Sequence, residues 1–359
     1  MTVLSEQFAG WIKRTGMKYV FRVDAAGKID KPAAKKYTVS TLQLPLTGVF
    51  QEIIMKRFFV LFIAAALLIG LMVPAFAEEY EIKVSAPSGA PALALAVLAA
   101  ENPDAYSFVA ADTITAEFAN ASADFIIAPI NAGAKLYRAG KSAYKLAAVV
   151  TWGNLYIASQ RPDFKPEDIN QAGITLFGEN TINSSITIYA LAQNGIEPAE
   201  INYLASAANT QSLLLTDENA IVLTAEPALT AARMKNEAIT AYSVNDLYKA
   251  AAGYDGFTQA GLFVNPKTAG DHPEAVEAYL EAAAESAEKC TTDLNAAAEA
   301  AAALEILPNV KVAQNAIPNC AIRFMPAAEA KDRVEITANI DLSQFGGAVP
   351  ADDFYYGAE

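Results

Sequence analysis

Few side chains in this chain could do nucleophilic or metal chemistry: one histidine, His272, and two cysteines, Cys290 and Cys320. A metal site or a catalytic triad needs several such groups within reach of one another. His272 stands directly before Pro273 at the start of a predicted helix, with no cysteine or second histidine near it in the sequence. We therefore expect a capping or surface role for His272, and neither a metal site nor a cofactor.

The segment Pro87–Pro91 indicates a different kind of chemistry, the binding of a polar or negatively charged group, because it ends a predicted strand and opens a helix. In open α/β sheets ligands bind beyond the carboxyl ends of strands, where free backbone N–H groups attract oxygen atoms. We expect Ser88, Gly89 and Ala90 to contact a ligand there. The alternative is a plain turn in which Gly89 supplies backbone freedom.

The segment Glu179–Ser185 is the matching strand-to-helix turn in the second half of the chain. Its hydroxyl and amide groups would face the same cleft, so we predict that Thr181, Asn183 and Ser184 bind the ligand. A capped helix start with solvated Ser and Thr side chains accounts for the same composition.

Five more candidate ligand-binding residues follow predicted strands. Pro129 and Asn131 end one strand; the Asn131 amide can donate and accept hydrogen bonds, although Asn131 could also serve only as a helix cap. Thr151 and Trp152 end another strand, and Trp152 either packs against the ligand or fills the floor of the cleft. Glu226 has three possible roles that the sequence leaves open: a ligand contact, a cap of the following helix, or a docking contact with a partner.

Short apolar runs alternate with helical stretches from Tyr80 onward, which predicts an α/β fold with a mostly parallel sheet covered by helices. Two βα units, the second inserted into the first, would make a bilobal protein with hinge crossings near Thr151–Gly153 and Thr258–Gly261. The predicted boundaries are residues 78–152 plus 259–345 for lobe 1, 153–258 for lobe 2 and 346–359 for a C-terminal tail. A linear pair of domains is the alternative.

The end of the chain is predicted to be almost entirely helical. A strand over Gln259–Asn265 returns to the first unit, and apolar residues then recur at helical spacing. The predicted helices cover Pro273–Lys289, Asn295–Leu304, Val310–Ile317 and Ala327–Ile340.

Residues 55–77 have the three-part layout of a secretory signal peptide: a basic start at Met55–Arg57, an apolar stretch over Phe58–Val73 and a small-residue exit at Ala75–Ala77. The apolar stretch is short for a membrane span and Pro74 ends it, so cleavage after Ala77 is favoured over a retained anchor. Residues 1–54 are then an upstream segment that we expect to be unstructured. The protein is predicted to be exported, to the periplasm or another extracytoplasmic space.

The chain has 359 residues, a net charge of −14 and a pI near 4.7. Without residues 1–77 it keeps 16 Lys or Arg and 36 Asp or Glu, a net charge of −20. Such a surface repels phosphate backbones and anionic membranes, which excludes nucleic acid as a partner. An even number of cysteines in an exported chain predicts a Cys290–Cys320 disulfide, with two buried free thiols as the alternative.

Six short motifs carry a family resemblance through their order and spacing. They are Ala86–Pro91, Ala123–Pro129, Ala225–Ala228, His272–Val276, Ala316–Cys320 and Gly346–Tyr356. Residues 80–356 resemble the solute-binding proteins of ABC importers, in the nitrate/sulfonate/taurine group of type II periplasmic binding proteins. The resemblance implies two lobes that close over a small molecule without altering it and deliver it to a membrane permease. We expect a monomer.

Two other functions stay open from the sequence. One is an enzyme similar to the thiamine-pyrimidine synthases, in which a histidine takes part; the export signal and the position of His272 count against it. The other is a ligand-loaded sensor that docks to a membrane receptor. Ligand identity is also open, because helix starts favour anions whereas the net charge and the absence of Lys or Arg in the predicted contact turns favour a neutral or zwitterionic molecule.

Overall fold

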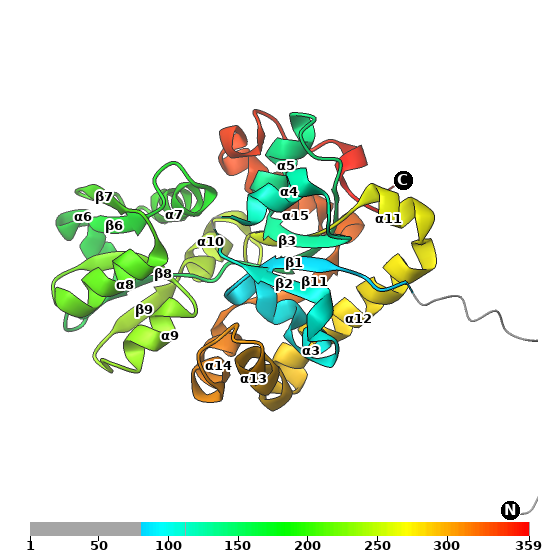
Figure 1. Cartoon of the computed structure of the whole chain (residues 1–359). Coiled ribbons are helices and arrows are strands. Elements are labelled where there is room, and N and C mark those ends of the chain that lie inside the picture. Colours follow the sequence, from blue (N-terminus) through cyan, green and yellow to red (C-terminus); the bar gives the residue numbers. More distant parts are fainter. Residues whose placement is uncertain (1–79, 112, 359) are drawn as a thin grey trace, which may run out of the picture. The chain divides into compact units, whose positions relative to one another are not determined.

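The computed structural model describes residues 80–111 and 113–358. The predictions about the upstream segment 1–54, the signal peptide 55–77 and cleavage after Ala77 lie outside the described residues. The described chain contains two β-sheets, each flanked by helices (Figure 1). Each sheet together with its helices is called a lobe, lobe 1 for the six-stranded sheet and lobe 2 for the five-stranded sheet. Among these described residues no helix is long and apolar enough to cross a membrane.

Lobe 1 holds a six-stranded sheet in the order β11-β4-β10-β3-β1-β2. Its strands are β1 (Val84–Pro87), β2 (Tyr106–Val109), β3 (Phe125–Pro129), β4 (Lys145–Thr151), β10 (Ala260–Val264) and β11 (Ile322–Pro326). β1 runs parallel to β2 and β3, whereas β10 is antiparallel to β3 and β4, and β11 is antiparallel to β4.

Lobe 2 holds a five-stranded sheet in the order β7-β6-β8-β5-β9. Its strands are β5 (Leu155–Ser159), β6 (Ile174–Phe177), β7 (Ile201–Leu204), β8 (Ile221–Ala225) and β9 (Thr240–Ser243). β6 is parallel to β7 and β8, but β5 is antiparallel to β8 and β9. Both sheets are therefore mixed, although most strands of each sheet run in one direction, as predicted: only β5 is reversed in lobe 2, and only β10 and β11 are reversed in lobe 1. β5 and β10 are the first strands after the chain crosses from one lobe to the other, and each is antiparallel to both of its neighbours.

Helices surround both sheets (Figure 1). In lobe 1 they are α3 (Ala96–Glu101), α4 (Glu117–Asn120), α5 (Ile130–Arg138), α11 (Pro266–Asp271), α12 (Pro273–Thr292), α13 (Leu294–Ala303), α14 (Val310–Ala316) and α15 (Ala327–Ile340). In lobe 2 they are α6 (Ile169–Ala172), α7 (Ile182–Gln193), α8 (Ala207–Thr216), α9 (Ala228–Arg233) and α10 (Val244–Ala252). The lobes also meet through helices, because α7 contacts α15 and α9 contacts α14.

The chain crosses between the lobes twice, which confirms the predicted α/β, bilobal fold and rejects a linear pair of domains. β4 is followed by β5 after three residues, and the chain returns from α10 to β10 over residues 253–259. The two crossings touch each other: a Cβ on Gly153 would collide with Phe257 and one on Gly256 with the Trp152 carbonyl oxygen. Gly153 also has a φ of +88°, so a side chain there is excluded on two grounds.

Two elements depart from the sequence prediction. β11 lies between two predicted helices and pairs with β4 at the edge of the lobe 1 sheet. Only Ile322 of its five residues is buried, so the strand has no apolar run that would reveal it. The second element is α10, a helix that the sequence analysis does not predict. Ser243 caps this helix, because its hydroxyl oxygen accepts a hydrogen bond from the backbone N–H of Asn245.

The predicted disulfide is not formed: Cys290 and Cys320 are both free and buried in the core of lobe 1. Their thiols face backbone carbonyl groups instead, Cys290 Sγ at 3.5 Å from the Leu93 oxygen and Cys320 Sγ at 3.2 Å from the Ala316 oxygen. Burial raises the pKa of the Cys290 thiol to about 12 and that of Cys320 well above its ordinary value. The alternative of two buried thiols therefore describes this pair.

His272 precedes α12, but its side chain makes no capping hydrogen bond. Its ring stacks on that of Tyr80 with centroids 3.8 Å apart, and the Tyr80 hydroxyl donates to Asp124 Oδ1 at 2.8 Å. Thr268 Oγ1 donates to the same oxygen. These contacts tie the start of the described chain to lobe 1, a structural role for His272.

Candidate functional site

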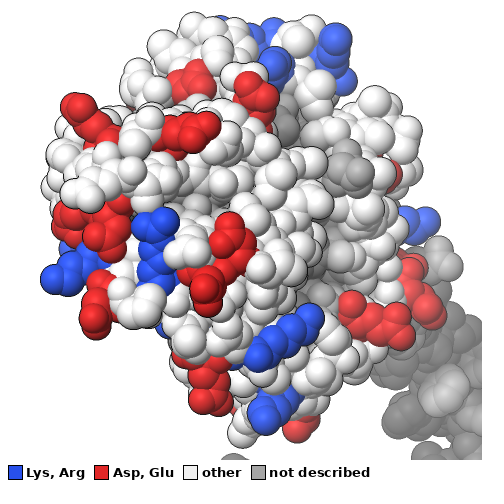
Figure 2. All heavy atoms as spheres, turned by 90° about the vertical axis from the view of Figure 1, so that its left-hand side faces the viewer, with Lys and Arg blue, Asp and Glu red and all other residues white. Residues whose placement is uncertain are grey.

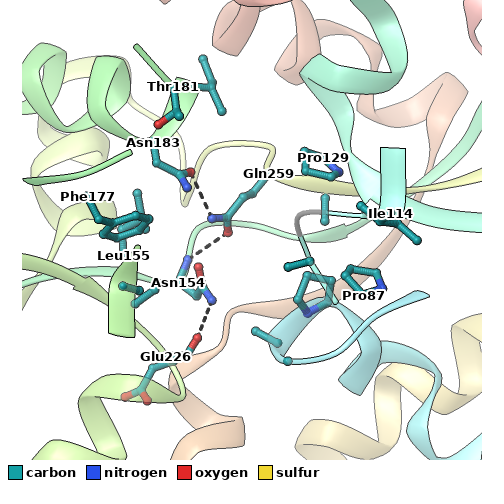
Figure 3. Close-up of a pocket in the computed structure, with 18 of the residues that line it drawn as sticks. Pro87, Ile114, Pro129, Asn154, Leu155, Phe177, Thr181, Asn183, Glu226 and Gln259 are labelled. Carbon is teal, nitrogen blue, oxygen red and sulfur yellow. Dashed lines mark hydrogen bonds between the residues drawn. The ribbon is translucent and has the colours of Figure 1, made fainter. Parts of the chain in front are cut away.

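A cavity of about 500 Å³ lies where the carboxyl ends of strands from both lobes meet (Figure 3). Both lobes and both crossings contribute to its lining. The lining residues are Pro87, Ser88, Gly89, Ala90, Pro91, Ala111, Ile114, Pro129, Asn131, Ala132, Asn154, Leu155, Phe177, Thr181, Ile182, Asn183, Ala207, Ala225, Glu226, Pro227, Gln259, Ala260 and Gln344. Its volume is in the range that holds a small organic ligand.

Five of the predicted residues of lobe 1 line this cavity: Ser88, Gly89, Ala90, Pro129 and Asn131. Ser88 and Gly89 stand between β1 and the 3-10 turn Ala90–Leu95, and Gly89 has a φ of +112° that excludes most other residues. The backbone N–H of Ser88 donates to the Val109 carbonyl, which fixes the turn against β2. Asn131, in the first turn of α5, places its amide at the cavity.

In lobe 2, the start of α7 reaches the cavity, and its polar residues divide into two groups. Thr181 and Ser184 form a reciprocal cap, in which each side-chain oxygen accepts from the other residue's backbone N–H, that of Thr181 reaching Ser184 Oγ at 3.3 Å. The two hydroxyls also donate, Thr181 Oγ1 to the Gly178 carbonyl and Ser184 Oγ to the Thr181 carbonyl. The alternative reading of this turn as a capped helix start is thus correct for both hydroxyls. Asn183 instead points away from the helix toward the middle of the cavity (Figure 3).

Gln259 and Asn154, one from each crossing, lie at the centre of the cavity and were not predicted from the sequence (Figure 3). Gln259 Nε2 donates to Asn183 Oδ1 and Gln259 Oε1 accepts from the Asn154 backbone N–H, both at 3.3 Å. Gln259 therefore links the returning crossing, the other crossing and lobe 2. Both residues fall in or next to the predicted crossings, so a search for amide side chains there would have found them.

Asn154 also fixes the segment after β8. Its Nδ2 donates to the Glu226 carbonyl at 2.8 Å, and the Glu226 backbone N–H donates to the Asn154 carbonyl at 2.9 Å. The Asn154 side chain is buried, and its Oδ1 has no hydrogen-bond partner within the described chain. A buried amide oxygen without a partner is costly, so a turn of the Asn154 side chain that brings Oδ1 to an N–H or O–H donor would be favoured.

Glu226 is 3% exposed and acts as a helix cap. Its Oε2 accepts from the Thr230 backbone N–H at 3.1 Å and its Oε1 from the Thr230 hydroxyl at 3.0 Å, in the first turn of α9. Burial raises the pKa of this carboxyl above its ordinary value, although the bonds from Thr230 and the charge of Arg233 oppose the shift. Of the three roles considered, capping is the one these contacts support.

Three predicted residues, Thr151, Trp152 and Ser184, do not line the cavity. Trp152 is 2% exposed; its Nε1 donates to the Arg323 carbonyl, and the Arg323 guanidinium lies 4.0 Å from the centre of its ring. Its side chain thus packs against β11 of lobe 1 and does not reach the cavity. Thr151 is buried beside β10, where its Oγ1 accepts from the Ala260 backbone N–H.

Additional hydrogen bonds join the lobes near the cavity. Ser185 Oγ, on α7, donates to Asp341 Oδ2 at the end of α15 with a distance of 2.7 Å. Gln344 Nε2 donates to the Asn180 carbonyl at 2.9 Å, and the Tyr156 hydroxyl to the Asn319 carbonyl at 2.9 Å. These bonds connect elements of separate lobes, so opening the cleft would break them.

The cavity is nearly free of charge. Among the residues that the structure describes, its lining includes no Lys, Arg, His, Asp or Cys, and Glu226 is the one ionisable residue. Charged side chains of both signs are instead spread over the outer face of lobe 2 (Figure 2). Across residues 80–111 and 113–358, no group of three or more His, Cys, Asp or Glu side chains is arranged to hold a metal ion. The lining can bind through shape and neutral hydrogen bonds.

Comparison with known proteins gives structural neighbours but no sequence match. No protein-family model matches the chain, and no curated protein matches it. An ABC transporter protein from Parabacteroides distasonis superimposes with a TM-score of 0.65 and 23% identity, over 77% of this chain and 99% of that chain.

Two further neighbours have lower identity. The periplasmic aliphatic sulphonate binding protein from Escherichia coli has a TM-score of 0.60 and 14% identity, over 77% of this chain and 92% of that chain. The ligand-binding component of an ABC-type import system from Staphylococcus aureus has a TM-score of 0.59 and 12% identity, over 77% and 98%. The two nested sheets with a cavity between them, and these superpositions, show that the chain has the bilobal fold of the solute-binding proteins of ABC transporters.

Proposed function

We propose that this protein is the solute-binding component of an ABC importer, which captures a small molecule between its lobes and hands it unchanged to a membrane permease. The observation that carries the proposal is the cavity itself, because it is lined by both lobes and both crossings and has the volume of a small organic ligand. The fold shared with ABC-transporter proteins supports the same role.

Binding without reaction is the second part of the proposal. A catalytic site needs a nucleophile or an acid–base group that can reach the bound molecule. Glu226, the ionisable residue of the lining, holds its carboxylate oxygens against Thr230 and is 3% exposed. The remaining polar groups of the described lining are amides and hydroxyls, and the lining residues that the structure describes include no His or Lys that could activate a hydroxyl as a base.

Location and partners complete the proposal. An importer component works outside the cytoplasm, which agrees with the signal-peptide pattern of residues 55–77 and cleavage after Ala77. We propose that eight of the predicted residues contact the ligand. They are Ser88, Gly89, Ala90, Pro129, Asn131, Thr181, Asn183 and Glu226, and all line the cavity together with Gln259 and Asn154. A monomer that meets its permease only when loaded is the simplest form of this function.

Thermal unfolding of the full chain in the presence of a broad nutrient panel tests this function. A ligand that binds only the folded state stabilises it by about 2.7 kcal/mol when its free concentration is 100-fold above Kd, which raises the melting temperature measurably. Mass spectrometry of the recovered compound should find it unchanged. No stabilisation by any compound, or conversion of the bound compound into a product, would reject the proposal.

A further inference from the structure

The residues that line the cavity indicate which class of ligand it binds. We infer that the cavity takes an electrically neutral molecule with an apolar body and an amide or hydroxyl group, and that it discriminates against sulfonates, carboxylates and phosphates. This inference rests on the proposed function and specifies its ligand.

The first argument is the absence of a cationic partner. No Lys or Arg is among the lining residues that the structure describes, and the hydrogen bonds of Asn154, Asn183 and Gln259 at the cavity use no cationic side chain. A buried anion must be compensated by a positive charge or a set of donors, because its loss of hydration is otherwise too costly. The net charge of −20 on residues 78–359 adds repulsion to this cost.

The second argument excludes a cation as the intended ligand. A bound ammonium group would need a carboxylate directed at it. The Glu226 carboxylate turns toward α9, where both oxygens bond to Thr230, whereas its backbone carbonyl is the part that faces Asn154 (Figure 3). Arg233, at the end of the same helix, further offsets its charge. The described part of the lining thus presents no free negative charge either.

The third argument is the match between the lining and a neutral amphipathic molecule. Apolar side chains form two sides of the cavity, with Pro87, Ile114 and Pro129 on one and Leu155 and Phe177 on the other (Figure 3). Neutral amides lie between these sides at Gln259, Asn183 and Asn154. An amide or hydroxyl ligand group can both donate and accept among them, which a sulfonate, an acceptor only, cannot do.

Asn154 adds a more specific observation. It is 7% exposed, lines the cavity, and its Oδ1 has no hydrogen-bond partner in the described chain, while its Nδ2 donates to the Glu226 carbonyl. This oxygen is enclosed by the described chain, so a ligand group reaches it only when the Asn154 side chain turns toward the cavity. An N–H or O–H group would then satisfy the oxygen, which an oxyanion cannot do.

Calorimetric titration of the full chain with hexanamide, hexanoate, hexane-1-sulfonate and hexylamine tests the inference, since the four compounds share a carbon chain and differ in the polar group. In parallel, any small molecule released when the purified protein is denatured is identified by mass spectrometry. We expect hexanamide to bind at least tenfold more tightly than either anion and the amine, and any released molecule to be uncharged.

The outcomes separate the two proposals. An anion or the amine bound as tightly as hexanamide, or a charged molecule released from the purified protein, overturns the neutral-ligand inference while leaving the import function intact. A released neutral molecule supports the inference even if hexanamide itself is too weak to detect. No binding and no released molecule rejects the proposed function, and the inference with it.

A pair of variants tests the cause of the discrimination. Asn131→Lys puts an ammonium group at the cavity, whereas Asn202→Lys adds the same charge on exposed β7, outside the lining. Hexane-1-sulfonate should bind at least tenfold more tightly to Asn131→Lys than to the unchanged protein and should not gain with Asn202→Lys. An equal gain in both variants, or none in either, would show that the lining does not set the charge preference.

Discussion

Removal of one hydroxyl between the lobes should weaken ligand binding without unfolding the protein. Ser185 Oγ on α7 donates to Asp341 Oδ2 at 2.7 Å, and this bond joins lobe 2 to the end of α15 in lobe 1. Ser185→Ala deletes the donor and leaves the helix intact, because alanine is the best helix former. If the bond exists only when the cleft is closed, its loss lowers the stability of the closed, ligand-holding state alone.

The expected magnitude follows from the setting of the bond. A hydrogen bond to a charged group contributes about 1.5–3 kcal/mol, and partial exposure to solvent reduces this value toward about 1 kcal/mol. A difference of about 1 kcal/mol in closure corresponds to roughly fivefold weaker binding. Asp341→Asn keeps one acceptor oxygen but removes the charge, so it should give a smaller loss in the same direction. The double variant should lose little more than Ser185→Ala, because the donor of the bond is already absent in that variant.

Calorimetric titration with the identified ligand measures this effect, and Ser212→Ala is the matched control. Ser212 lies exposed on α8 and its hydroxyl bonds only within that helix, to the Ala208 carbonyl. Unchanged affinity in Ser185→Ala, or an equal loss in Ser212→Ala, would refute the reasoning that contacts between α7 and α15 hold the cleft shut over its ligand.

Three other predictions concern the described chain. Gly89→Ala should destabilise the protein by about 1–3 kcal/mol in urea titrations because φ at this position is +112°, and an unchanged midpoint would contradict that backbone conformation. Cys290 and Cys320 should resist thiol reagents in the native protein and react after denaturation, whereas fast labelling of the folded protein would contradict their burial. The raised pKa of Glu226 means that the folded state holds this proton more tightly than the unfolded state does, so stability should fall as pH rises above about 4.5 through the folded pKa. The Glu226→Gln variant should lack this part of the decline, and identical pH profiles of unfolding free energy would contradict the assignment.

The sequence was sufficient to predict the bilobal fold because its strands are buried runs separated by Pro and Gly turns. β3 is one such run, and Pro129 ends it where α5 begins. β11 escaped prediction because an edge strand with one buried residue has no such pattern, and its place beside β4 is set by pairing across the sheet. The reversed direction of β5 and β10 is likewise a tertiary feature that follows from the crossings.

The candidate site divides in the same way. The ends of strands can be recognised in the sequence, so Ser88, Gly89 and Asn131 could be predicted as ligand contacts, and all three line the cavity. Gln259 and Asn154 were missed because their importance comes from hydrogen bonds between residues 105 positions apart. The sequence places Trp152 at a crossing, where a large aromatic ring could either contact the ligand or pack inside the protein. The structure distinguishes these two roles, because the ring is 2% exposed and the Arg323 guanidinium stacks on it.

A crystal structure of the protein with the compound that it retains on purification tests the central claim most directly. The account predicts electron density for an unmodified neutral molecule between Pro129 and Phe177, with hydrogen bonds to the amides of Asn131, Asn183 or Gln259 and with both lobes in contact. Density for a molecule attached outside this cavity, contact with one lobe only, or a chemically altered compound would contradict it.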